Sequence, residues 1–301
     1  MAKRLDIAST SSAHRLTQRL KAEVLSHPVI VANPYTAWFE RGTASPDQAR
    51  ALLVQFSVFS NEFLVAQLKK MLNADSIDAM HESKEILANE IGVGFRANVR
   101  TDDAELGSLS GSIEGGTFRF RAAHFELLVR AAHGLGLRFE ELGKRRFGTE
   151  STLFFCDELV RLYGHEDYAV AAAASWAIEN WAAAGFWDQL VAGWDKFRVR
   201  THLESLNIGF FTWHARLEAN HAQHTWDELS NWLAGREIDE DAFVARANEM
   251  LDAVNVFWTG LDRQRQDIAA LGALGAHPAC NGIAGGGVAK LHGRAPNGDK
   301  S

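Results

Sequence analysis

The chain of 301 residues contains only two cysteines, Cys156 and Cys280, and neither belongs to a CxxC pair. This scarcity excludes a disulfide-rich scaffold and a thiolate zinc site, so a metal would have to be held by histidine and carboxylate. Basic residues are also in the minority: 31 Lys and Arg stand against 38 Asp and Glu, which gives a formal net charge of −7. This sign disfavours binding to nucleic acid or to an anionic membrane through a basic field.

Proline and long hydrophobic runs are scarce as well. Only 5 prolines occur, whereas all-β chains need frequent turn residues, so most of the chain is predicted to be helical. The most apolar stretch, residues 168–193, is interrupted by polar and charged residues, among them Glu179 and Asp188. The N-terminus lacks the apolar segment of a signal peptide. We therefore expect a cytoplasmic protein with no membrane span.

Helix-capping signals and periodicity predict a single all-α domain. Ser45, Pro46 and Gln48 are typical of a helix N-terminus, and they begin a long helix over about 46–73. Further helices are expected at about 12–25, 76–91, 118–134, 152–163, 167–194, 203–232 and 239–261. The domain organisation that we predict is an N-terminal helix and linker over 1–44, a helical bundle over 45–262 and a flexible Gly/Ala-rich tail over 263–301.

A cluster of histidines near the end of the predicted bundle could bind a metal. In the stretch TWHARLEANHAQHTW, His214, Glu218 and His221 have HxxxExxH spacing. At about 100° per residue these three side chains fall within an arc of about 60° on one helix face. A solvated polar face has the same spacing, but the aromatic residues around this cluster favour a buried site.

Four more polar side chains stand in apolar surroundings on other predicted helices. They are Glu62 between Phe59 and Phe63, Glu90 four residues after Ile86, His124 one turn before Leu127, and Glu179 as the one ionised residue of an Ala-rich stretch. A buried carboxylate is unfavourable unless it is paired or bound to a metal. We therefore expect these four residues to converge with the histidine cluster.

The charge of this set indicates what it would bind. Four ionised carboxylates in an apolar bundle would have strongly raised pKa values, but two divalent cations would balance their charge. Oxygen and imidazole ligands without thiolate suit Fe(II) or Mn(II), and helical bundles build dinuclear carboxylate sites from inward-facing side chains. The residues alone thus favour a two-metal site.

The order of these motifs resembles a known family. A Glu is followed by NExGxG, then H-x(8)-HGLGL, then a lone Glu in an Ala-rich helix and finally HxxxExxH, over about residues 45–232. This order is similar to that of the haem-oxygenase-like diiron oxidases and oxygenases, iron-containing redox enzymes with a TenA/PqqC-like fold. The resemblance implies an up-down helical bundle. It also implies a metal-ligand set comprising Glu62, Glu90, His124, Glu179, His214, Glu218 and His221.

The resemblance also implies the chemistry. Two Fe(II) ions, or a Mn/Fe pair, would activate O2 as co-substrate and oxidise a small amino-acid-like or aliphatic substrate, with an external reductant and a homodimeric assembly. The chain departs from the family at Glu218, where Asp is usual, and in the 34-residue separation of Glu90 from His124. That separation makes the glycine-rich segment 93–117 a candidate lid. His224 is additional, and we interpret it as a candidate for orienting a ligand.

Two alternatives remain open at this stage. One is a metal-free enzyme on the same bundle, as in the related thiaminase-like and quinone-cofactor-synthesis proteins, although no cysteine lies in the helix that holds Glu179. The other is a non-catalytic helical protein that binds a small molecule. In that case the buried acids would destabilise the fold instead of binding ions.

Overall fold

A computed structural model describes residues 14–95, 118–120 and 122–275, apart from 217–225, 227, 228, 230, 231, 234, 235 and 237. After a helical turn at 14–19, the elements in chain order are η1 (Leu20–Val24), α2 (Pro28–Val31), α3 (Pro34–Phe39), α4 (Pro46–Leu72), α5 (Ile77–Glu90), β1 (Val93–Phe95), β2 (Phe118–Phe120), α6 (His124–Gly134), η4 (Phe139–Glu141), η5 (Arg145–Phe147), α7 (Glu150–Tyr163), α8 (Tyr168–Ala182), α9 (Phe186–Thr201) and α11 (Glu240–Gly275). Residues 209–216 are also helical.

The predicted start of the long helix is confirmed. Ser45 accepts a hydrogen bond from the backbone of Gln48, and the Gln48 side chain accepts one from the backbone of Ser45, which together make a complete capping box. Pro46 occupies the first helical position, where its missing N–H costs nothing. These local contacts anchor α4, which carries one wall of the site described below.

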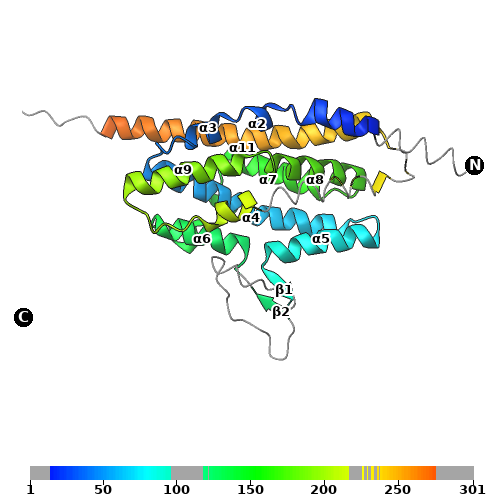
Figure 1. Cartoon of the computed structure of the whole chain (residues 1–301), viewed down its shortest axis with the longest axis horizontal. Coiled ribbons are helices and arrows are strands. Elements are labelled where there is room, and N and C mark those ends of the chain that lie inside the picture. Colours follow the sequence, from blue (N-terminus) through cyan, green and yellow to red (C-terminus); the bar gives the residue numbers. More distant parts are fainter. Residues whose placement is uncertain are drawn as a thin grey trace, which may run out of the picture.

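The helices run side by side along the long axis of the molecule (Figure 1). α4 contacts α5, α6, α7 and α11, and α11 also packs on α7 and α8. α2 and α3 lie along α11 at one face. The core between these helices is strongly aromatic, and its fully buried side chains include Phe56, Trp176, Trp194, Phe257 and Trp258.

The N-terminal region is more helical than predicted. The segment between the first helix and Ser45 was expected to be a linker, yet it forms α2 and α3. Both helices begin with proline, and their N-caps are His27 and Asn33, whose side chains accept hydrogen bonds from backbone N–H groups. Both starts have the Xaa-Pro signature of a helix N-terminus, which could have been recognised in the sequence.

The prediction of one helix over 167–194 is wrong, because this segment forms parts of two helices. α8 ends at Ala182 and α9 begins at Phe186. Between them Gly185 has φ of 88°, a left-handed conformation that glycine adopts without the steric cost of a side chain. The Ala-rich composition of the residues before Gly185 hides this break, so periodicity alone predicts one continuous helix.

Two other predicted helix starts are displaced. Residues 118–120 are a strand that pairs antiparallel with 93–95, in the register Val93 to Phe120, and the helix expected from 118 begins only at His124. Residues 203–208 are not helical, and the helix expected from 203 begins at 209. The Asn207 side chain accepts a hydrogen bond from the backbone N–H of Gly209 and favours a turn before that helix.

The final helix continues beyond its predicted end. α11 extends to Gly275, so the first part of the expected flexible tail, residues 263–275, is helical. Asp262 supports this extension because it accepts hydrogen bonds from Arg265 and Gln266 one turn later. The rest of the expected tail, residues 276–301, lies outside the described residues.

α4 is the one helix in the described part of the chain that is long and apolar enough to cross a membrane by those criteria alone. Half of its most apolar window is buried inside the protein, and α4 contacts four other helices. The central helix of a packed bundle meets the same criteria, so these properties are explained by packing.

Candidate metal centre

The His214 ring is held in orientation by its neighbours. His214 lies in the helical segment 209–216, is 8% exposed and stacks on Trp187 with the ring centroids 4.6 Å apart. Its Nδ1 lies 2.7 Å from the carbonyl oxygen of Phe210, one turn earlier. A carbonyl can only accept, so Nδ1 carries a proton and donates it to Phe210. Metal-binding histidines are commonly oriented by such a hydrogen bond to a carbonyl.

His124 and Glu90 meet in the interior from different helices. His124 is the first residue of α6 and Glu90 the last residue of α5. The distance from His124 Nδ1 to Glu90 Oε2 is 2.8 Å, but Nδ1 is buried and has no partner in hydrogen-bonding geometry. The two atoms are therefore close enough for an ion pair but are not aligned for a shared proton. Two ligand atoms of one cation lie close together in the same way, without a hydrogen bond between them.

These three residues form a compact group. Glu90, His124 and His214 each offer one ligand atom, and the three atoms lie within 4.8 Å of one another. Two imidazoles and one carboxylate are the ligand set of many mononuclear non-haem Fe(II) sites. The donors present therefore suit a first-row divalent metal such as iron.

Glu179 lines the same small cavity as two members of this group. Glu90, Glu179 and His214 all line the cavity, which has a volume of about 60 Å³. The walls are largely aromatic: Phe56, Phe59, Phe63, Trp181, Trp187 and Phe210. Polar ligand atoms thus face a space enclosed by apolar rings, and a metal ion there would be largely shielded from water.

Three residues that support Glu179 were missed in the sequence. The Tyr163 hydroxyl lies 3.4 Å from Glu179 Oε1 and accepts a hydrogen bond from Gln67 at 2.6 Å. Lys70 is 1% exposed, and its ammonium donates to Ser175 and lies over the Tyr163 ring. Gln67 and Lys70 lie four and seven residues after Phe63, on the same face of the helix. This spacing was the only feature of the sequence that could have indicated that they support Glu179.

Glu62 does not lie with this group in the structure. Its carboxylate pairs with Arg145 at 3.3 Å, and Arg145 also pairs with Asp157. The residues of α4 that line the cavity are Phe56, Phe59, Ser60 and Phe63. At about 100° per residue, Glu62 projects roughly 100° away from the middle of the face formed by Phe59, Ser60 and Phe63. Apolar neighbours in the sequence therefore did not indicate the cavity face.

The negative charge of Glu62 affects a different neighbour. Cys156 is fully buried, and burial, with a smaller contribution from Glu62, raises the pKa of its thiol to about 12. This thiol is therefore protonated at neutral pH and is a poor nucleophile.

The remaining predicted ligands lie outside the described residues. These are Glu218 and His221, together with the additional His224. The same applies to most of the candidate lid, of which only residues 93–95 are described. The structure thus brings together Glu90, His124 and His214, places Glu179 beside them and separates Glu62.

Comparisons with known proteins identify the fold. No family model and no curated protein matches the chain. A Shewanella denitrificans structure, described as a domain of unknown function with a heme oxygenase-like fold, matches with a TM-score of 0.54 and 12% identity over 87% of this chain and 94% of that one. A CADD-like protein of unknown function from Nostoc punctiforme matches in two crystal structures, with TM-scores of 0.54 and 0.52 and identities of 18% and 19%. These cover 86% and 85% of this chain and 99% and 96% of that one.

The chain therefore has a haem-oxygenase-like, all-α helical fold, as its sequence predicted. At these identities the likeness concerns the fold alone, because one fold hosts many unrelated activities.

Proposed function

We propose that this protein is an O2-dependent non-haem oxidoreductase that holds two iron ions inside its helical bundle and oxidises a small organic substrate. The observation that supports the proposal most is the convergence of Glu90, His124 and His214 from three separate helical segments. The fold is compatible with this activity, and the resemblance of the sequence motifs adds support.

The ligands divide into those the structure describes and those that only the motif supplies. Glu90, His124 and His214 would hold one ion, and Glu179, which lines the same cavity, would contribute to the second. By resemblance, Glu218 and His221 would complete the set. When bound, the two ions would supply the redox chemistry with O2, which protein side chains do not provide themselves.

The chain itself positions the ligands and excludes water. The Phe210 carbonyl accepts a hydrogen bond from His214 Nδ1 and so orients the ring. Tyr163 donates to Glu179, which restrains that carboxylate at the cavity wall. The aromatic rings around the cavity keep solvent away, and a low local dielectric strengthens the attraction between carboxylates and cations.

Iron stoichiometry in matched variants tests the proposal. The full-length protein is loaded with Fe(II) under anaerobic conditions, freed of unbound metal and analysed for iron per chain. We expect about two irons per chain in the unmodified protein, as in other two-metal sites, and fewer than one in His214→Ala and Glu90→Gln. The controls are His133→Ala and Glu62→Gln, which remove a histidine and a carboxylate that do not face the cavity.

Two outcomes would contradict the proposal. One is less than one iron per chain in the unmodified protein with no further loss in His214→Ala. The other is consumption of O2 with an organic substrate that survives treatment with a chelator, which would support the metal-free alternative.

A further inference from the structure

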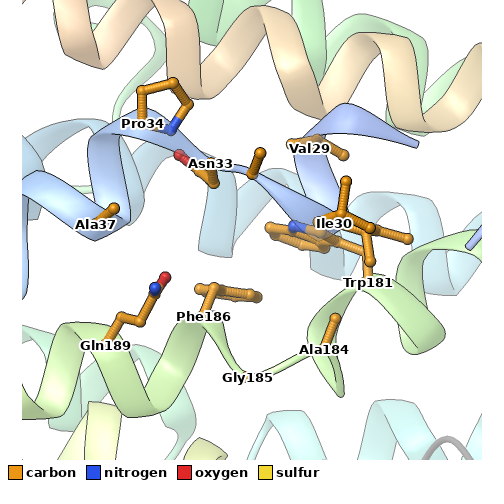
Figure 2. Close-up of a pocket in the computed structure, with 12 residues that line it drawn as sticks. Val29, Ile30, Asn33, Pro34, Ala37, Trp181, Ala184, Gly185, Phe186 and Gln189 are labelled. Atoms are coloured by element: carbon orange, nitrogen blue, oxygen red, sulfur yellow. The ribbon is translucent and has the colours of Figure 1, made fainter. Parts of the chain in front are cut away.

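A second, larger cavity opens on the other side of Trp181. It has a volume of about 460 Å³ and lies between the segment 29–37 and the turn that connects α8 to α9. In Figure 2, Phe186 and Gln189 lie on the side of this space opposite Asn33. Its volume is in the range of small-molecule binding sites, about 300 to 1,000 Å³. Below we call it the outer pocket.

Asn33 lines the outer pocket and has a buried donor. Its Oδ1 caps α3, accepting hydrogen bonds from the N–H groups of Tyr35 at 3.0 Å and Thr36 at 3.3 Å. This role assigns the other side-chain atom as the NH2 group. Asn33 is 8% exposed, and its Nδ2 is buried without a hydrogen-bond partner in the described part of the chain. A buried, unsatisfied donor is unfavourable, and an acceptor on a ligand would relieve that cost.

Gln189 presents a second donor from the opposite wall. Its Oε1 accepts a hydrogen bond of 2.6 Å from the Thr36 hydroxyl. That bond orients the amide and leaves the Nε2 group without a hydrogen bond to any described residue. The outer pocket therefore offers two amide donors, one on each side.

The end of α9 adds to this polarity. α9 has 16 residues and begins at Phe186 directly after Gly185, and no side chain caps its N-terminus. Gly185 and Phe186 both line the outer pocket. The free N–H groups of a helix N-terminus carry partial positive charge, which favours an acceptor nearby.

The remaining surface of the outer pocket is apolar. Trp181 and Phe186 stack with their ring centroids 4.5 Å apart and an interplanar angle of 12°, and Ile30 faces them. Val31 also lines the pocket and is 65% exposed, which leaves apolar surface in contact with solvent. No lysine or arginine is among the lining residues, and the charged residue adjacent to Gln189 is an acid, Asp188. These features disfavour an anion.

We propose that the outer pocket binds a small, uncharged molecule with an apolar body and a carbonyl oxygen, such as an amide or a ketone. The carbonyl oxygen accepts from Asn33 Nδ2 and Gln189 Nε2, and the apolar body packs on Trp181 and Phe186. This site is independent of the proposed metal chemistry. Trp181 also lines the inner cavity, so a ligand in the outer pocket contacts a wall of the candidate metal centre.

Binding of pentanamide to the full-length, chelator-treated protein tests this proposal without iron. Affinity is measured by titration calorimetry or ligand-observed NMR and compared with pentanoate and pentylamine, which have the same apolar tail but carry a charge. We expect pentanamide to bind more tightly than either ion. Asn33→Ser keeps a capping oxygen for α3 and removes the Nδ2 donor, so it weakens pentanamide binding by about 2- to 13-fold, the effect of one hydrogen bond.

Gln189→Glu is a second variant that keeps an acceptor for Thr36 but removes the opposite donor, and it also weakens binding. Asn73→Ser, at the end of α4 and absent from the pocket lining, leaves the affinity unchanged. Three results would overturn the proposal: equal affinities for the three probes, unchanged affinity in both folded pocket variants, or binding that appears only after removal of residues 276–301. The last result would assign the outer pocket to the chain's own C-terminal segment.

Discussion

Replacement of Trp213 by Phe should strengthen metal binding, because Trp213 stabilises the metal-free arrangement of His124. The indole N–H of Trp213 donates to His124 Nε2 at 3.2 Å, which requires a lone pair on Nε2. A metal on Nε2 would use this lone pair itself. A metal on Nδ1 would require the proton to sit on Nε2. In both cases metal binding breaks the hydrogen bond from Trp213.

The size of the effect follows from that one bond. A neutral hydrogen bond contributes about 0.5–1.5 kcal/mol net of water, so Trp213→Phe should lower the metal dissociation constant by about 2- to 13-fold. The affinity for Fe(II) is measured anaerobically by competition with a chromophoric chelator. Trp194→Phe is the control, because it makes the same change at a buried tryptophan whose indole N–H has no hydrogen-bond partner among the described residues.

A spectroscopic measurement separates this mechanism from a general effect of packing. In the unmodified protein, metal loading should shift the indole N–H vibrational band that Trp213→Phe removes. The reasoning is refuted if Trp213→Phe folds normally and binds Fe(II) with unchanged or lower affinity. Such a result would mean that Trp213 supports His124 as a ligand.

Three further predictions concern stability and the residues near the site. Gly185→Ala should lower the free energy of unfolding by about 1–2 kcal/mol in urea titrations, because a Cβ there meets nothing within 4 Å and only the left-handed backbone is penalised; an unchanged midpoint would contradict this. The pKa of Cys156 is raised from 9.0 to about 12, so between these pH values the unfolded chain loses a proton that the folded chain keeps. The free energy of unfolding should therefore fall as pH rises above about 9, by up to about 1.4 kcal/mol per pH unit from this group, and Cys156→Ala should remove that part of the slope; equal slopes would exclude it. Glu62→Gln should change stability by less than about 1 kcal/mol, because the side chain of its partner Arg145 is 45% exposed and the pair is screened by solvent. Iron stoichiometry should not change, and a loss of iron would restore Glu62 to the ligand set.

The sequence by itself determined the helical class and many helix ends. Ser45 is an N-cap in the structure as expected, because capping depends on contacts between residues only a few positions apart. The sequence also drew attention to Glu90, His124, Glu179 and His214, because each is a polar side chain within an apolar segment.

Only the tertiary structure decided which of those side chains meet. Glu62 and Glu90 have similar apolar neighbours in the sequence, yet one pairs with Arg145 and the other faces His124. The difference arises because periodicity shows which residues share a helix face but not how each helix is rotated against its neighbours. That rotation is set by packing between segments distant in sequence, and the same packing placed Asn33 and Gln189 on opposite walls of the outer pocket.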